Sequence, residues 1–258
     1  MVLGSRNTVV HSSYISEQET HASIDFDGAG DFVTVGNVGT VKMLSFWFSP
    51  DSELGPASSI TRLMQWYSIG GSTYFGIHIS DTTGILTNET LTLMINAQTR
   101  VGAINYTFSA GAWFHVFCSW SDTNDAWNLY INGVNVGVAA SGDGSAQTLA
   151  DFTAFKWGRD GGSSNMFNGK MTDVAIWDTS YDAAGDNTEN DAIAGILYNG
   201  GVPHDPRIAS GDYTAPIIAQ LTGYWRSNEG TGTNVEDLVG SNDGTITNAT
   251  WSTNSPYS

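Results

Sequence analysis

The chain has 258 residues, 12% of them aromatic, which is ample apolar material for one large core. Nine basic residues against 26 acidic ones give a formal net charge of −17, and this charge repels nucleic acid and anionic lipid headgroups. We therefore expect no nucleic-acid partner. The lone Cys118 excludes an intrachain disulfide, and its place in an apolar run predicts a small buried side chain.

The N-terminal segment is predominantly polar. Residues 1–23 contain one basic residue and no apolar run long enough for an export signal, and no segment of the chain reaches transmembrane length. We expect a soluble chain without membrane insertion, in which residues 1–20 form a polar arm and residues 21–258 form a single domain. The alternative is an exported protein whose signal is missing from this sequence.

Short apolar or alternating runs recur along the chain between clusters of Gly, Ser, Asn, Asp and Thr, a pattern typical of an antiparallel sandwich or barrel. Residues 23–35 predict a strand, a tight turn and a second strand. Residues 41–50 predict a strand that a proline ends. Residues 61–80 predict a hairpin around a Gly-Gly turn, and residues 90–98 predict another strand.

The stretch WFHVFCSWSDTNDAWNLYING, residues 113–133, is the most aromatic part of the chain. Over residues 113–120 both alternating sets of side chains are largely apolar, so both faces of this strand must be covered. Asn132-Gly133 follows the next apolar run and predicts a hairpin, because both residues tolerate positive φ. These aromatic residues are thereby explained as core.

One short helix is predicted near residue 190. Thr188 can cap it, Asp191 supplies the acidic partner of a capping box, and Gly200 can close its C-terminus. We expect it to pack on the edge of the sandwich. Its apolar face consists of Ala192, Ile193, Ile196 and Leu197.

Six motifs follow one another along the chain: FDGAGDFV (26–33), WFHV (113–116), LYING (129–133), KWG (156–158), FNGKMTDVAIW (167–177) and ILYNGG (196–201). In order and spacing they resemble the laminin-G-like domains of the concanavalin A-like lectin/glucanase superfamily. GYWRSNEGTG (223–232) resembles a segment that often precedes such domains. The resemblance implies an all-β fold: a two-sheet antiparallel jelly-roll β-sandwich, with ligand sites on the concave face or the rim loops.

The resemblance also implies a structural calcium near the first strand, held by an aspartate in the strand after the F-x-G motif. Asp173 matches that aspartate, while the acidic residue often found just before it is Thr172 here. Asp25, Asp27 and Asp31 flank Gly28 and Gly30 in the first turn, where carboxylate and carbonyl oxygens can bind a hard cation. We therefore predict Asp27 and Asp173 as a calcium pair. The alternative for Asp27 is an ordinary turn residue.

Retaining glycoside hydrolases of this superfamily carry two glutamates on one strand in a Glu-x-Asp-x-x-Glu pattern, and this sequence contains no such pattern. It also lacks a Gly-x-Ser-x-Gly elbow and any His or Cys pair with zinc spacing. We therefore predict that the chain is not an enzyme.

Sugar binding usually needs an exposed aromatic ring beside polar groups. Three places offer this combination: the Gly-Gly turn of residues 61–80, the acidic loop before WNLYI, and a polar loop after KWG. The alternative role of each aromatic ring is packing in the core. The alternative role of the acidic loop is to form a hairpin turn. The candidate ligand residues are Trp66, Tyr74, Asp122, Asp125, Trp127, Asp160 and Asn165.

We predict a non-catalytic recognition or assembly module, most consistent with a phage virion protein that decorates a capsid or tail surface and contacts glycans. The polar arm, the missing export signal and the acidic shell favour this function. Its expected partners are virion proteins or further copies of the chain. The alternatives are an exported, extracellular carbohydrate-binding module and a polysaccharide-degrading enzyme.

Overall fold

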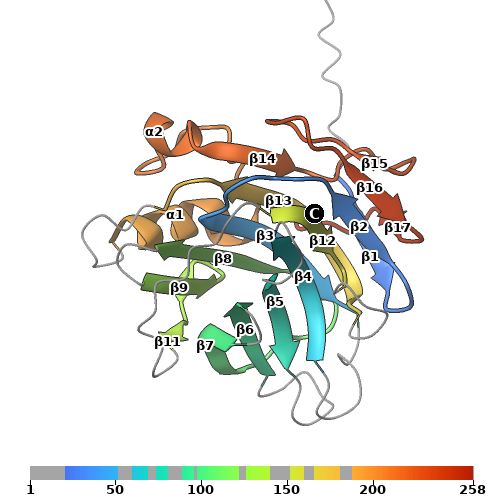
Figure 1. Cartoon of the computed structure of the whole chain (residues 1–258), viewed down its shortest axis with the longest axis horizontal. Coiled ribbons are helices and arrows are strands. Elements are labelled where there is room, and N and C mark those ends of the chain that lie inside the picture. The colour runs from blue at the N-terminus through green and yellow to red at the C-terminus, as the bar shows by residue number, and fades with distance from the viewer. Residues whose placement is uncertain are drawn as a thin grey trace, which may run out of the picture.

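The fold is seen in a computed structural model of the chain (Figure 1). The predicted arm, residues 1–20, lies outside the residues that the structure describes. No helix within the described part of the chain is long and apolar enough to cross a membrane. The structure describes residues 21–51, 60–68, 74–80, 89–95, 98–121, 126–139, 152–159, 166–180 and 188–257.

The strands within these ranges form two antiparallel sheets (Figure 1). Sheet A has eight strands, in the order β10 (Val134–Asn135), β9 (Ala126–Ile131), β8 (Phe114–Ser121), β3 (Met43–Pro50), β13 (Asn168–Trp177), β1 (Ser23–Asp27) and β17 (Thr250–Ser252), with β14 (Leu221–Trp225) also paired to β13. Sheet B has nine strands, in the order β11 (Val138–Ala139), β7 (Gln98–Tyr106), β6 (Glu89–Ile95), β5 (Tyr74–Ser80), β4 (Ile60–Ser68), β12 (Phe152–Trp157), β2 (Phe32–Val35), β16 (Gly244–Thr247) and β15 (Asn234–Val235). The predicted two-sheet jelly-roll sandwich is confirmed.

The main apolar core lies between the sheets. Side chains of a strand alternate between its two faces, and in β3 Leu44, Phe46 and Phe48 belong to this core. Val116 and Cys118 of β8 belong to it as well, so the lone cysteine is buried, as predicted. Burying apolar area at about 25 cal/mol per Å² makes this core the main source of stability.

A second apolar cluster covers the other face of sheet A. Met43 of β3 and Phe117 of β8 pack there with Ile193 and Leu197 of helix α1 (Thr188–Tyr198). Strand β8 is therefore buried on both faces, as its sequence predicted. The helix was expected at the edge of the sandwich, whereas it lies on the outer face of sheet A beside the edge strand β10.

Local sequence signals account for the ends of these elements. At the β9–β10 hairpin, Asn132 has φ +52° and Gly133 has φ +75°, which confirms the predicted turn. Helix α1 runs into the 3₁₀-helix η1 (Asn199–Gly201), where Gly200 has φ +68°. A further helix, α2 (Ala215–Ile218), was not predicted; Pro216 lies in its first turn, where its missing N–H costs nothing.

The strands of the first predicted strand–turn–strand unit do not pair with each other. β1 joins sheet A beside β13, and β2 joins sheet B beside β12. The C-terminal part of the chain then extends both sheets, because β17 pairs with β1 and β16 pairs with β2 (Figure 1). The first turn therefore lies at a corner where both sheets and the C-terminal strands meet.

Candidate functional site

The turn between β1 and β2 is shaped by two glycines with positive φ, +77° at Gly28 and +104° at Gly30. Within it the Asp27 carboxylate oxygen Oδ1 accepts the backbone N–H of Ala29 at 2.7 Å. The backbone N–H of Asp27 donates to Oδ2 of Asp31 at 2.8 Å. These bonds fix the positions of both carboxylates.

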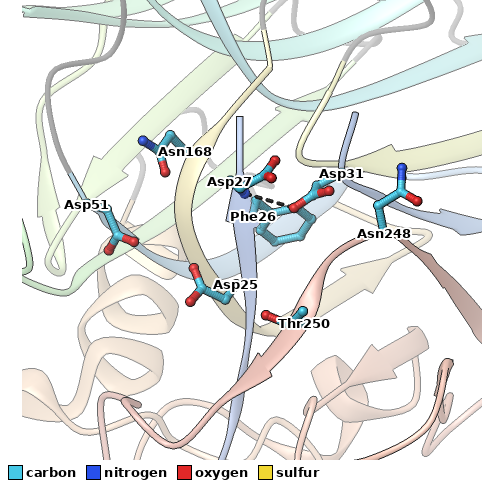
Figure 2. A pocket seen from close by; sticks show the side chains of 8 residues that line it. All are labelled: Asp25, Phe26, Asp27, Asp31, Asp51, Asn168, Asn248 and Thr250. Carbon is cyan, nitrogen blue, oxygen red and sulfur yellow. Dashed lines mark hydrogen bonds between the residues drawn. The ribbon is translucent and has the colours of Figure 1, made fainter. Parts of the chain in front are cut away.

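A pocket of about 290 Å³ opens beside this turn (Figure 2). Its walls come from β1, the β1–β2 turn, the end of β3, the start of β13 and the β16–β17 turn. Side chains far apart in sequence thus converge on one cavity. The lining residues are Asp25, Phe26, Asp27, Asp31, Asp51, Asn168, Asn248 and Thr250.

Strand pairing positions the lining residues. On β1, Asp25 lies opposite Lys170 of β13 and opposite Thr250 of β17. In the β16–β17 turn, Asn248 has φ +60° and its Nδ2 donates to the carbonyl oxygen of Gly30 at 3.1 Å. The C-terminal strands therefore brace the pocket and supply part of its wall.

Lys170 pairs with two of the four carboxylates. The Lys170 ammonium lies 2.6 Å from Asp51 Oδ1 and 3.5 Å from Asp25 Oδ1. With all four aspartates ionised, four negative charges and one positive charge leave a net −3 at the pocket.

Two carboxyl groups are harder to ionise than in water. Partial burial raises the pKa of Asp25, and nearby Lys170 opposes this. Burial likewise raises the pKa of Asp31, which is 4% exposed, and the N–H of Asp27 opposes it. Both carboxylates gain from a ligand that brings hydrogen-bond donors or positive charge.

The pocket presents mainly hydrogen-bond acceptors. Carboxylates accept hydrogen bonds, and the amides of Asn168 and Asn248 and the hydroxyl of Thr250 can both donate and accept. Its aromatic member, Phe26, is fully buried and belongs to the core. The site can thus bind hydroxyl or ammonium groups, and it offers no exposed ring for stacking from the residues that line it.

Trp127, the predicted ligand residue whose side chain the structure describes, does not line this pocket. Trp127 is half-buried against the main core and stacks on Trp120, with ring centroids 5.9 Å apart and planes inclined by 11°. The backbone of Trp66 in β4 pairs with that of Phe75, and Tyr74 in β5 pairs with Tyr67.

Four predicted ligand residues lie outside the described residues. These are Asp122, Asp125, Asp160 and Asn165.

The structure does not bring the predicted calcium pair together. Asp27 lies opposite Asn168 on β13, five residues before Asp173, which is about 17 Å along a strand. Both carboxylate oxygens of Asp173 lie within hydrogen-bonding distance of protein hydroxyl groups. Among the described residues, no group of three or more His, Cys, Asp or Glu side chains could hold a metal ion. The residues present therefore do not fit an ion shared by Asp27 and Asp173.

Sequence reasoning recognised the aspartates of the first turn and missed most of the pocket. Asp51, Asn168, Asn248 and Thr250 were not proposed as site residues. Their signals are weak: Asp51 follows the strand-ending proline, and Asn168 is the variable residue of the F-x-G motif.

The family model of the concanavalin A-like lectin/glucanases superfamily matches residues 18–184, more than half of the chain. The chain belongs to this superfamily. The superfamily match includes Asp25, Asp27, Asp31, Asp51 and Asn168 of the pocket and ends before α1. The β16–β17 wall of the pocket lies beyond it.

No curated protein matches the chain. Among solved structures, a candidate carbohydrate-binding protein from Bacteroides ovatus is 18% identical with a TM-score of 0.54, and the match covers 88% of this chain and 60% of that one. A heptameric SAP-like pentraxin from Limulus polyphemus is 14% identical with a TM-score of 0.51, covering 69% of this chain and 82% of that one. At these identities the similarity shows a shared lectin-like fold.

A phage structure is also similar. Tailspike protein 2 of an Escherichia coli O157:H7 bacteriophage is 12% identical with a TM-score of 0.46, covering 84% of this chain and 31% of that one.

Proposed function

We propose that this chain is a non-catalytic recognition module that binds neutral or amine-bearing glycans in the acidic pocket. The observation that carries the proposal is the convergence of four aspartates, two asparagines and a threonine on one cavity of about 290 Å³. Sugar hydroxyl groups donate hydrogen bonds, and ionised carboxylates are strong acceptors for them.

Charge narrows the class of ligand. With all four aspartates ionised, the described part of the pocket carries a net −3, and the whole chain carries −17, so an anionic sugar meets repulsion at long and short range. A neutral sugar replaces pocket water through its hydroxyls, and a protonated amino sugar adds Coulombic attraction. The lectin-like fold of the Bacteroides ovatus protein, described as a candidate for carbohydrate binding, is consistent with this class.

Recognition without turnover is supported by the carboxylates themselves. The retaining mechanism uses two carboxyl groups about 5 to 5.5 Å apart, supplied in this superfamily by the glutamate pattern that the sequence lacks. The described residues that line the pocket include four aspartates and no glutamate. Its carboxylates are engaged instead in turn formation and in ion pairs with Lys170.

The proposal also includes where the module is located. We assign the module to an exposed surface, a phage virion or the cell exterior, where it decorates a particle together with further copies or other surface proteins. The strongly acidic composition supports exposure to solvent and solubility at high local concentration. Co-purification with a particle would distinguish the virion from the cell exterior.

A glycan array tests the proposal. We expect binding to neutral or amino-sugar glycans and none to sialylated or sulfated ones, with no reducing sugar released from a polysaccharide panel. Preferential binding of anionic glycans would overturn the assignment of the pocket. Release of reducing sugar would show that the module is an enzyme.

A further inference from the structure

Three tryptophans with described side chains are half-buried. Two of them, Trp127 and Trp251, pack against the main core. The third, Trp113, belongs to neither apolar cluster and stacks on no other ring among the described residues. It was expected in the core with the other aromatic residues of 113–133, so the structure corrects this expectation. Core packing does not explain this ring.

The side chain of Trp113 lies on the outer face of sheet A. Phe114, the first residue of β8, points into the main core, so the residue before it points the other way. The indole N–H donates to Asn254 Oδ1 at 3.1 Å. The carbonyl oxygen of Asn254 in turn accepts the hydroxyl of Ser23 on β1 at 2.7 Å. The indole therefore extends from β8 across the outer face toward β1.

Strand register brings this ring into line with the acidic pocket. On β3, Ser49 is level with Trp113 on one side and lies opposite Lys170 of β13 on the other. On β1, the pocket residue Asp25 lies opposite Lys170. Trp113 and Asp25 thus share one face of sheet A, three strand spacings or about 14 Å apart at their backbones.

The segment before β8 also contacts the wall of the pocket. The backbone N–H of Gly111 donates to the carbonyl oxygen of Pro50 at 2.7 Å, and the next residue, Asp51, lines the pocket. The Lys170 ammonium pairs with both Asp51 and Asp25. The surface between the ring and the pocket therefore carries charged groups that sugar hydroxyls can bind.

An indole beside polar groups suits a sugar. A pyranose has an apolar face of C–H groups, which packs on the negatively polarised face of an aromatic ring, and a rim of hydroxyls. The pocket of about 290 Å³ supplies polar groups and is small for a drug-sized ligand, so it fits a single sugar unit. Asn254 orients the ring before a ligand arrives, which lowers the entropic cost of binding.

We propose that Trp113, oriented by Asn254, is the stacking residue of a second sugar subsite beside the acidic pocket. This inference rests on the proposed function and narrows it. The ligand is an oligosaccharide, with an amine-bearing unit in the pocket and a neighbouring unit on the indole. A single sugar occupies the pocket alone.

Titrations of the full chain with glucosamine and with its β-1,4-linked tetramer test the proposal at a mildly acidic pH, where the amines are protonated. The wild type should bind the tetramer more tightly than glucosamine. Trp113→Ala should weaken tetramer binding about 10-fold and leave glucosamine binding unchanged. Trp113→Phe keeps an aromatic ring and should lose less. Trp127→Ala is the matched control and should bind both sugars as the wild type does, because its ring packs against the main core.

Asn254→Ala separates a role in binding from a role in folding. It keeps the indole and removes the acceptor that orients it, so tetramer binding should weaken about 3-fold while glucosamine binding stays unchanged. Equal tetramer binding by Trp113→Phe and Trp113→Ala would overturn the proposal, because stacking on the ring would then contribute nothing.

Failure of the proposed function and failure of this inference give different results. If the acidic pocket is not a sugar site, the wild type binds neither sugar, or Asp27→Asn binds both as the wild type does. If the second subsite alone is wrong, Asp27→Asn weakens the binding of both sugars and Trp113→Ala weakens neither.

Discussion

Replacing Gly133 with valine tests the packing of the β9–β10 hairpin against helix α1. Gly133 has φ +75°, where a β-branched residue costs about 1 to 3 kcal/mol. A Cβ there would lie 3.2 Å from Tyr198 Cδ1 and 3.3 Å from Gly195 Cα on α1, and such overpacking costs about 1 to 3 kcal/mol more. We expect a loss of about 4 kcal/mol and a melting temperature lower by roughly 8 to 16 °C.

Gly111→Val is the matched control for this experiment. Gly111 has φ +74° and nothing within 4 Å of its added Cβ, so it carries the backbone cost alone. In thermal unfolding, the melting temperature of Gly133→Val should therefore be clearly lower than that of Gly111→Val. Equal melting temperatures would refute the contact between the hairpin and α1, and an unchanged Gly133→Val would refute the turn.

Three further outcomes are expected from unfolding experiments. Gly169→Ala should lose more than about 3 kcal/mol, because its Cβ would collide with the Ser49 carbonyl oxygen at φ +146°. Asp237→Ala should lose about 3 kcal/mol, since its carboxylate accepts four backbone N–H groups. The free energy of unfolding of the wild type should fall relative to that of Asp173→Asn between pH 4 and 6, because the folded pKa of Asp173 is raised to about 6. Chemical unfolding at several pH values measures this difference, and parallel curves would contradict it.

Local features of the fold were predictable because their cause is local. Asn132-Gly133 forms its hairpin through the φ values those two residues tolerate, and Gly200 ends α1 for the same reason. Burial of β8 on both faces followed from the large apolar residues in both of its alternating sets of side chains. The family resemblance supplied the overall sandwich.

Pairing between distant segments was not predictable in this way. Nothing in residues 23–35 shows that β1 and β2 enter different sheets, because a tight turn also suits a hairpin. The pocket joins five segments, so its members share no spacing in the sequence. The family resemblance implied a calcium ligand at Asp173. The sequence could not show that the hydroxyls holding this carboxylate come from Tyr224 and Tyr257, 51 and 84 residues away.

The central claim, recognition through the acidic pocket, is tested most directly by titrating the best array glycan into wild type, Asp27→Asn and Asp212→Asn. Asn keeps an acceptor for the turn at Asp27 and removes its charge, whereas Asp212 is exposed and does not line the pocket. We predict a dissociation constant about 10- to 100-fold weaker for Asp27→Asn, as loss of a charged hydrogen bond implies, and an unchanged one for Asp212→Asn. Equal affinities for all three proteins would contradict the account.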